Sequence, residues 1–321
     1  MKRNYVLEPL GEMKAMYQAY HEEMVALSRE NGKIVLLYGD FPHGAAGDLL
    51  QKEHPNRIYD VGIAEANLIT TAAGLAGGGY LPFTHCHSIF AVGRAYNQIR
   101  QNVAFDKLNV RIVLCNSGML WPFMGGSHQM IEDIAAIRVI PNLVLVSPSD
   151  PVSMKKATSA LVEHAGPAVM RISNPAVPTV YRDDFPFELG KAVTLTEGSD
   201  AAIISTGMML SDALEAVDVL AKEGIKVRLL DMHTIKPIDE EAIIKAARET
   251  GAIVTVEDSS ILGGLGGAVA EITAENAPVP VKRVGIKDRF GQSGTVPELK
   301  QEYELSARHI AQAVRESVKK K

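Results

Sequence analysis

The 321 residues could form two ordinary domains, and 46% hydrophobic with 22% charged residues is typical of a globular chain. A formal net charge of −5 gives no sign of a basic surface, so nucleic acid is not the expected partner. No apolar run approaches the roughly 18 residues of a membrane span, no secretory signal is evident, and two cysteines do not make a disulfide framework, so we expect a cytoplasmic protein.

Short β-branched runs alternate with helical patterns in the first half of the chain. Buried strands are predicted at 33–40, 110–118 and 142–150, and helices at 11–30, 63–78 and 88–104. This alternation predicts a mostly parallel sheet with helices on both faces.

The stretch 174–190 contains several prolines, follows neither period and is predicted to be a linker. Beyond it the alternation resumes, with strands at 200–207, 226–237, 252–258 and 281–286 and helices at 209–223, 239–250 and 264–275. The predicted fold class is therefore α/β with two domains, 1–182 and 190–321.

A single carboxylate, Glu65, stands near the start of the apolar segment "GIAEANLITTAAGLAGGGY". In the simplest interpretation it complements the dipole of a helix. Residues 72–79 are so small, however, that we expect this helix to lie against another backbone or a ligand, and a buried acid there needs a partner. A buried carboxyl that keeps its proton can donate to a ring nitrogen, so Glu65 is a candidate for binding a heterocycle.

Other candidates lie where strands end and helices begin, as expected for sites in open parallel sheets. Asp40 and Asn116 follow predicted strands, Phe90 is placed either for stacking or for core packing, and His128 lies in a glycine-rich loop. His85 and His87 flank Cys86 as a zinc site would require, but no second ligand cluster accompanies them, so no metal site is predicted on this chain.

Several blocks, in order, carry a specific resemblance. They are "DVGIAEANLITTAAGLAGGGYLPF", "FAVGRAYNQIRQNVA", "GGSHQMIEDIAAIRVIPN", "SPSDPVSM", "HTIKPID" and "VEDSSILGGLGGAVAE". From about residue 11 to about 315 the chain resembles the C-terminal half of a transketolase, and in particular the C-terminal subunit of transketolases split over two genes.

The resemblance implies thiamine diphosphate as cofactor, bound between a pyrophosphate-binding domain and a pyrimidine-binding domain of different subunits. Glu65 matches the glutamate that hydrogen-bonds the aminopyrimidine and favours its imino tautomer, which creates the ylide. Phe90 matches the aromatic that stacks on the pyrimidine, while His87 and Asp40 are expected near it. His128 matches a histidine that faces the substrate oxygens, where an imidazole could stabilise an alkoxide or move its proton.

The family's motif for the diphosphate and its metal, G-D-G followed by two asparagines, does not occur in these 321 residues. The resemblance therefore implies that Mg²⁺ or Ca²⁺ is bound through an N-terminal partner subunit carrying that motif. We expect an α2β2-type assembly and no activity from this chain alone.

The substrate half of the site departs from the family. Met124 replaces the donor-binding aspartate, Asn116 a histidine that meets the acceptor phosphate, and Asn174 an arginine, although Arg171 remains. Tyr17 stands in the place of another arginine, 41–46 lacks an expected serine, and His87 replaces a phenylalanine. We expect His128, Asn116, Met124 and Arg171 to contact the substrate, a sugar or keto compound that differs from the usual sugar phosphates. Alternatively, the partner subunit or Arg94, Arg138 and Arg171 supply the missing charge.

The expected activity is transfer of a two-carbon ketol unit from a ketose donor to an aldehyde acceptor. Alternatives are an acyloin-forming enzyme similar to deoxyxylulose-phosphate synthase, the beta subunit of a 2-oxo-acid dehydrogenase, and a non-catalytic pseudoenzyme scaffold.

Overall fold

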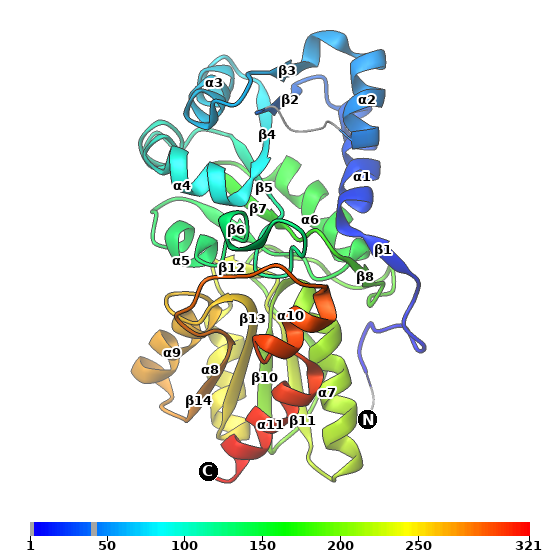
Figure 1. The fold of residues 1–321 in the computed structure, drawn as a ribbon, viewed down its shortest axis with the longest axis vertical. Coiled ribbons are helices and arrows are strands. Elements are labelled where there is room, and N and C mark those ends of the chain that lie inside the picture. The colour runs from blue at the N-terminus through cyan, green and yellow to red at the C-terminus, as the bar shows by residue number, and fades with distance from the viewer. Residues whose placement is uncertain (1–2, 40–43) are drawn as a thin grey trace.

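The computed structural model describes residues 3–39 and 44–321, except for the side chains of 44–47. Its first sheet has seven strands and lies at the top of Figure 1. Its order is β12-β6-β7-β5-β4-β2-β3, parallel except for β12. These strands are β2 (Ile34–Tyr38), β3 (Ile58–Asp60), β4 (Leu81–His87), β5 (Arg111–Cys115), β6 (Val144–Val146), β7 (Ala168–Ile172) and β12 (Thr234–Lys236).

Helices cover both faces of this sheet, as predicted (Figure 1). One face carries α1 (Met16–Glu30), α2 (Gly44–Glu53) and α6 (Pro151–Glu163); the other carries α3 (Glu65–Gly77), α4 (Ser88–Gln98) with its π-helical continuation η2 (Ile99–Phe105), and α5 (Asp133–Arg138). The start of α6 shows how sequence sets a boundary: Asp150 accepts from Ser153 N in a capping box, and Pro151 occupies the first turn.

The second sheet has the order β14-β13-β10-β11-β9 and is parallel except for β9. Its strands are β9 (Val193–Thr196), β10 (Ala201–Ser205), β11 (Val227–Asp231), β13 (Ile253–Ser260) and β14 (Val281–Ile286). Helices α8 (Glu240–Thr250) and α9 (Leu265–Asn276) cover one face, and α7 (Leu210–Lys222) and α11 (Ala307–Val318) the other, with α10 (Val296–Glu302) before α11. The α/β, two-domain fold class is confirmed.

Two segments differ from their prediction. The run 226–237 is not one strand: β11 stays in the second sheet, while β12 pairs with β6 of the first, with Thr234 opposite Val146. The predicted linker 174–190 is packed rather than free, because β8 (Ala176–Pro178) pairs with β1 (Met13–Ala15) and the buried Tyr181 stacks on Phe185.

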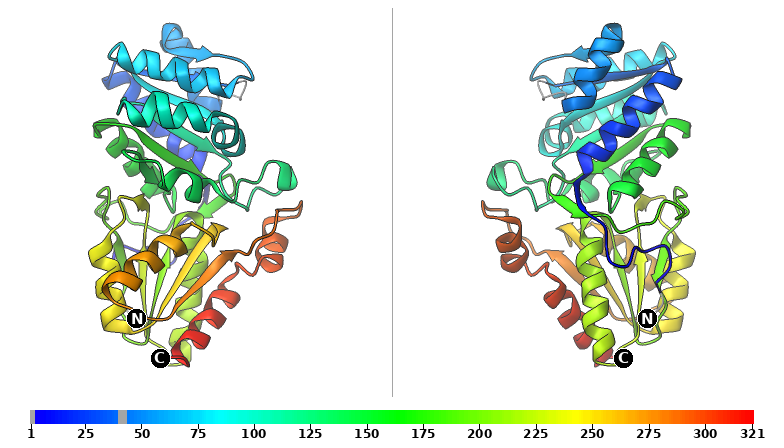
Figure 2. Two further views of the ribbon diagram at one scale, coloured as in Figure 1. Left: turned by 90° about the vertical axis from the view of Figure 1, so that its left-hand side faces the viewer. Right: turned by 90° about the vertical axis from the view of Figure 1, so that its right-hand side faces the viewer.

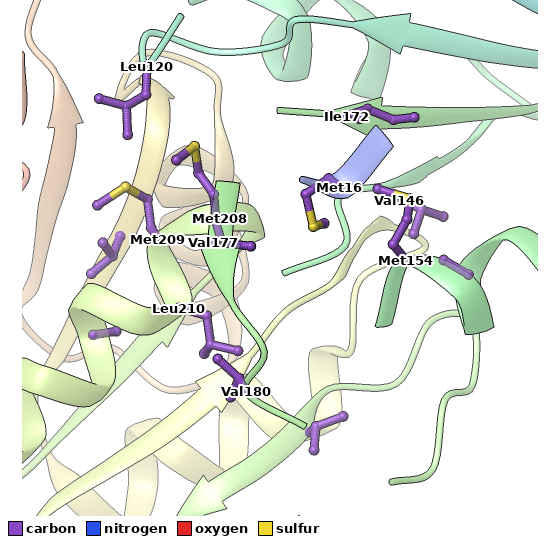
Figure 3. Packing of buried hydrophobic residues seen from close by; sticks show 14 of the residues in the cluster. Met16, Leu120, Val146, Met154, Ile172, Val177, Val180, Met208, Met209 and Leu210 are labelled. Carbon is purple, nitrogen blue, oxygen red and sulfur yellow. The ribbon is translucent and has the colours of Figure 1, made fainter. Parts of the chain in front are cut away.

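A continuous apolar cluster joins the two domains. Figure 3 shows Met208, Met209 and Leu210 of the second domain together with Leu120 and Val177 from the first, and all of them are buried. Full burial of a large apolar side chain stabilises the folded state by about 1.5–3 kcal/mol, so this cluster favours the packed arrangement of the two domains. None of the described helices is long and apolar enough to cross a membrane.

A buried ion network lies at the same junction. The Arg171 guanidinium, at the end of β7, donates from Nε to Asp133 Oδ2 at 2.8 Å and contacts Asp258 Oδ1 of β13 at 3.3 Å. Burial alone would lower the pKa of Arg171, but the charges of Asp133 and Asp258 outweigh burial and raise it. The three side chains are almost completely inaccessible, so their charges depend on one another for compensation.

We expect Arg171→Met to lower the free energy of unfolding by about 3–5 kcal/mol, because it leaves two buried carboxylates without their cation. Urea unfolding followed by circular dichroism measures this change. The matched control is Arg182→Met, which removes an exposed guanidinium paired with the exposed Asp184 and should change little. Equal effects of the two substitutions would show that the network does not stabilise the domain junction.

Candidate active site

Glu65 occupies the first turn of α3 and is only 4% exposed. Its Oε2 lies 3.3 Å from Nη1 of Arg94 on α4, and this guanidinium is largely exposed. Phe90 is one helical turn before Arg94 on α4, so the two side chains point to the same side of that helix. The carboxylate and the guanidinium therefore meet where α3 and α4 pack together, and the ring of Phe90 lies on the same side of α4.

At the far end of α3, no described backbone of this chain fills the place that its small residues lead us to expect for another backbone or a ligand. Gly74 and Gly77 are exposed, and a Cβ built on either one would touch nothing within 4 Å. Within the described part of this chain, that surface of α3 lies against no other backbone.

Phe90 and three neighbouring rings form an aromatic cluster. His87, at the end of β4, stacks on Trp121 with ring centroids 4.8 Å apart and an interplanar angle of 20°. His128 approaches Phe90, Trp121 and His87 edge-on at 5.2, 5.6 and 5.9 Å. Burial lowers the pKa of His87 to about 4, with a smaller contribution from His128, so His87 is neutral near pH 7. The cluster offers a planar ligand an aromatic wall and one adjacent carboxylate.

The loop that carries His128 is held by the second domain. Gln129 Nε2 donates to Trp121 O at 2.9 Å and to Gln292 O at 3.1 Å. These two acceptors belong to two segments that project on the same side of the molecule in Figure 2, the green loop after β5 and the orange-brown segment before α10. The sequence did not identify Gln129 as a site residue. The one feature that could have indicated it is its position directly after His128.

Two amides extend the cluster along the sheet edge. Asn116, buried at the end of β5, donates from Nδ2 to His87 Nδ1 at 2.8 Å. Asn174, half-buried after β7, donates from Nδ2 to Asn116 Oδ1 at 2.8 Å. Asn116 has φ +56°, a left-handed conformation that asparagine tolerates better than most residues.

The structure therefore brings Glu65, Phe90, His87, His128 and Asn116 into one region. Met124, half exposed, lies in the loop leading to His128. Asp40 and residues 41–43 lie outside the described residues, as do the side chains of 44–46.

The prediction for Arg171 needs a different reading. Arg171 was expected to contact substrate, but its side chain is 1% exposed and is paired with Asp133 and Asp258, so it supports the site from the interior. Neither His85 nor His87 belongs to any group of three His, Cys, Asp or Glu side chains that could hold a metal among the residues described. Tyr20 Oη instead shares a hydrogen bond of 2.7 Å with His85 Nε2.

A buried acid at a helix start and an aromatic wall at the edge of an α/β sheet would suit a flat heteroaromatic ligand. Family models identify the class of protein. The transketolase pyrimidine-binding domain matches residues 12–179, and the transketolase C-terminal domain matches residues 190–310. The chain belongs to the transketolase family.

Relatives match along almost the whole chain. The 6-deoxy-6-sulfo-D-fructose transketolase subunit SqwH of Clostridium sp. (strain MSTE9) is 38% identical over 94% of both chains. A putative transketolase C-terminal section of Methanocaldococcus jannaschii is 41% identical over 97% of this chain and 98% of its own. A solved structure described as a split-gene transketolase, an inactive beta4 tetramer, has a TM-score of 0.89 at 40% identity and covers 95% of this chain and 98% of its own.

We expect Gly291→Ala to displace the His128 loop, because its Cβ would overlap Gln129 Oε1 and come within 3.1 Å of Met119 Sδ. Trp121 is the only tryptophan of the chain and its carbonyl is held by Gln129, so its fluorescence emission should shift to longer wavelength. In the matched control Gly294→Ala, the new Cβ meets Leu299 at an ordinary 3.4 Å, and the emission should stay unchanged. A Gly291→Ala spectrum identical to the unmodified one would contradict this packing.

Proposed function

We propose that this chain is the pyrimidine-binding subunit of a thiamine diphosphate-dependent enzyme that transfers a two-carbon ketol unit from a ketose to an aldehyde. When bound, the cofactor supplies the carbanion chemistry, and the protein supplies orientation and proton transfer. The observation that carries the proposal is the buried Glu65 carboxylate beside Phe90 and within one region with His128.

The residues present fit the pyrimidine half of that cofactor. Glu65 provides the single carboxyl that a ring nitrogen needs, and Phe90 provides a face for stacking. Their meeting point at the start of α3 excludes much of the surrounding water, which strengthens such a hydrogen bond. Glu65 then holds the ring in one tautomer, and His128 stabilises or moves a proton on the substrate oxygen.

A partner subunit completes the proposed enzyme. The metal and diphosphate motif is absent from the sequence, and the solved relative is described as an inactive tetramer of beta chains. Large apolar side chains are also exposed around the site, including Ile63 at 70%, Phe123 at 81% and Phe290 at 83%. We propose that an N-terminal subunit covers them in an α2β2-type assembly and binds Mg²⁺ or Ca²⁺ with the diphosphate.

In the complex with that N-terminal subunit, we expect Glu65→Gln to reduce ketol transfer at least about 100-fold, since an amide cannot exchange the proton that a carboxyl does. Calorimetry with thiamine diphosphate and the unfolding midpoint should show that the cofactor still binds and the fold is intact. The matched control is Glu240→Gln, an exposed acid in the first turn of α8 that should keep full turnover. Near-normal turnover by Glu65→Gln would refute the proton-transfer role.

His128→Ala and Phe90→Ala should separate catalysis from cofactor binding. Loss of the imidazole should lower kcat by about 100-fold or more with little change in cofactor Kd, because His128 acts on the substrate oxygen. Loss of the Phe90 ring should raise the cofactor Kd by about threefold to tenfold, in line with the loss of one stacking contact. The reverse pattern, measured by calorimetry and steady-state kinetics, would exchange the two assignments.

Transfer from pyruvate instead of a ketose would identify an acyloin-forming enzyme, and dependence on a lipoyl carrier would identify a 2-oxo-acid dehydrogenase subunit. Failure of the assembled pair to bind thiamine diphosphate would favour the scaffold alternative.

A further inference from the structure

The three neighbouring strands β4, β5 and β7 present a row of linked polar side chains at their ends. In the register of the sheet His87 lies opposite Cys115, and Cys115 lies opposite Ile172. Two hydrogen bonds of 2.8 Å link the row: Asn174 Nδ2 donates to Asn116 Oδ1, and Asn116 Nδ2 donates to His87 Nδ1. Because an amide NH₂ group only donates, His87 Nδ1 accepts, and the ring orientation is fixed from one side. We call these three residues the amide row.

Every member of the amide row is electrically neutral near pH 7. Asparagine carries no charge, and burial lowers the pKa of His87 to about 4. Its ring stacks on Trp121 and meets the rings of His128 and Phe90 edge-on, in a largely apolar setting. The row therefore consists of neutral donors and acceptors.

The nearby arginines do not supply free positive charge either. Three arginines were named above as possible sources of the missing positive charge. Each of them is already paired with a carboxylate of this chain. The pairs are Arg94 with Glu65, Arg138 with Glu271, and Arg171 with Asp133 and Asp258. For Arg138 and Arg171, whose guanidinium groups are mostly or fully buried, binding an anionic substrate would require giving up an existing partner. Arg94 is largely exposed, but its guanidinium lies against Glu65 at the other end of the site.

Neutral amides and charged groups select different ligands. A phosphate or sulfonate seated on neutral donors alone loses its hydration without a compensating cation, whereas charge-assisted hydrogen bonds are about twice as strong as neutral ones. A sugar hydroxyl both donates and accepts, which suits a carboxamide. Within the described residues, Asn174 Oδ1 has no hydrogen-bond partner, although Asn174 is only half-buried.

We propose that the amide row receives the hydroxyl-bearing, uncharged end of a sugar, so that the substrates are ketoses and aldoses without a phosphate or sulfonate there. This inference rests on the proposed ketol transfer and specifies its substrate class. It makes Asn174, Asn116 and His87 the residues of this chain that determine specificity.

The test compares matched donors with the complex of this chain and its N-terminal partner subunit. We expect kcat/KM for D-xylulose to equal or exceed that for xylulose 5-phosphate and for 6-deoxy-6-sulfo-D-fructose, with D-ribose as acceptor. A tenfold or greater preference for either anionic donor would overturn the inference. Hydroxypyruvate serves as a donor that has no distal end to be selected.

Asn174→Arg places a cation at the rim of the amide row and should raise the ratio of xylulose 5-phosphate to D-xylulose turnover at least tenfold. Asn276→Arg adds the same charge at the end of α9, on the exposed surface of the second domain, and should leave the ratio unchanged. If Asn174→Arg does not fold, Asn174→Asp provides the opposite charge and should lower the same ratio. An unchanged ratio in the folded variant would show that Asn174 does not contact the distal end, which also overturns the inference.

The outcomes separate this inference from the function on which it rests. No transfer from any donor, including hydroxypyruvate, would refute the ketol transferase and the substrate class together. Efficient transfer from phosphorylated donors only would leave the transferase standing and refute the uncharged substrate class.

Discussion

The Arg171 guanidinium, buried between one carboxylate of each domain, sets the relation between the two halves of this chain. Three ionised groups without access to water are stable only as a set, so strand β7, the start of α5 and strand β13 must keep their mutual positions. Asp133 also accepts from Ser88 Oγ at 3.3 Å, and Ser88 directly follows His87. The aromatic cluster is thus connected through Ser88 to a fully buried network of charged side chains.

The site combines two kinds of surface with different chemistry. At one end the buried Glu65 and the ring of Phe90 suit a flat heterocycle. At the other end His87, Asn116 and Asn174 form a neutral row of hydrogen-bonding groups. His128 lies between them, in contact with the rings of both Phe90 and His87, where a cofactor and a substrate would meet. The polar end is uncharged because its members are two amides and an imidazole whose pKa burial lowers to about 4.

Local sequence signals predicted those features that depend on nearby residues. The five consecutive apolar residues of β2 and the apolar run of β5 were clear, and Glu65 stood out as the single acid of an apolar segment. Strand β4 was not predicted, because Thr84, His85 and His87 interrupt its apolar pattern; His85 is buried there with a bond to Tyr20, 65 residues away. The interior position of Arg171 depends on Asp258, 87 residues further on, and no local pattern carries that information. Asp40 stays a prediction.

Strand β12 has a consequence for how such a chain can be inherited. It belongs to the second half of the polypeptide, yet it closes the open edge of the first sheet beside β6. A gene rearrangement that separated the halves would uncover the backbone amides and carbonyls of β6, and an exposed strand edge invites aggregation. The two halves are therefore expected to be inherited together, because only together do they leave the first sheet with an intact edge.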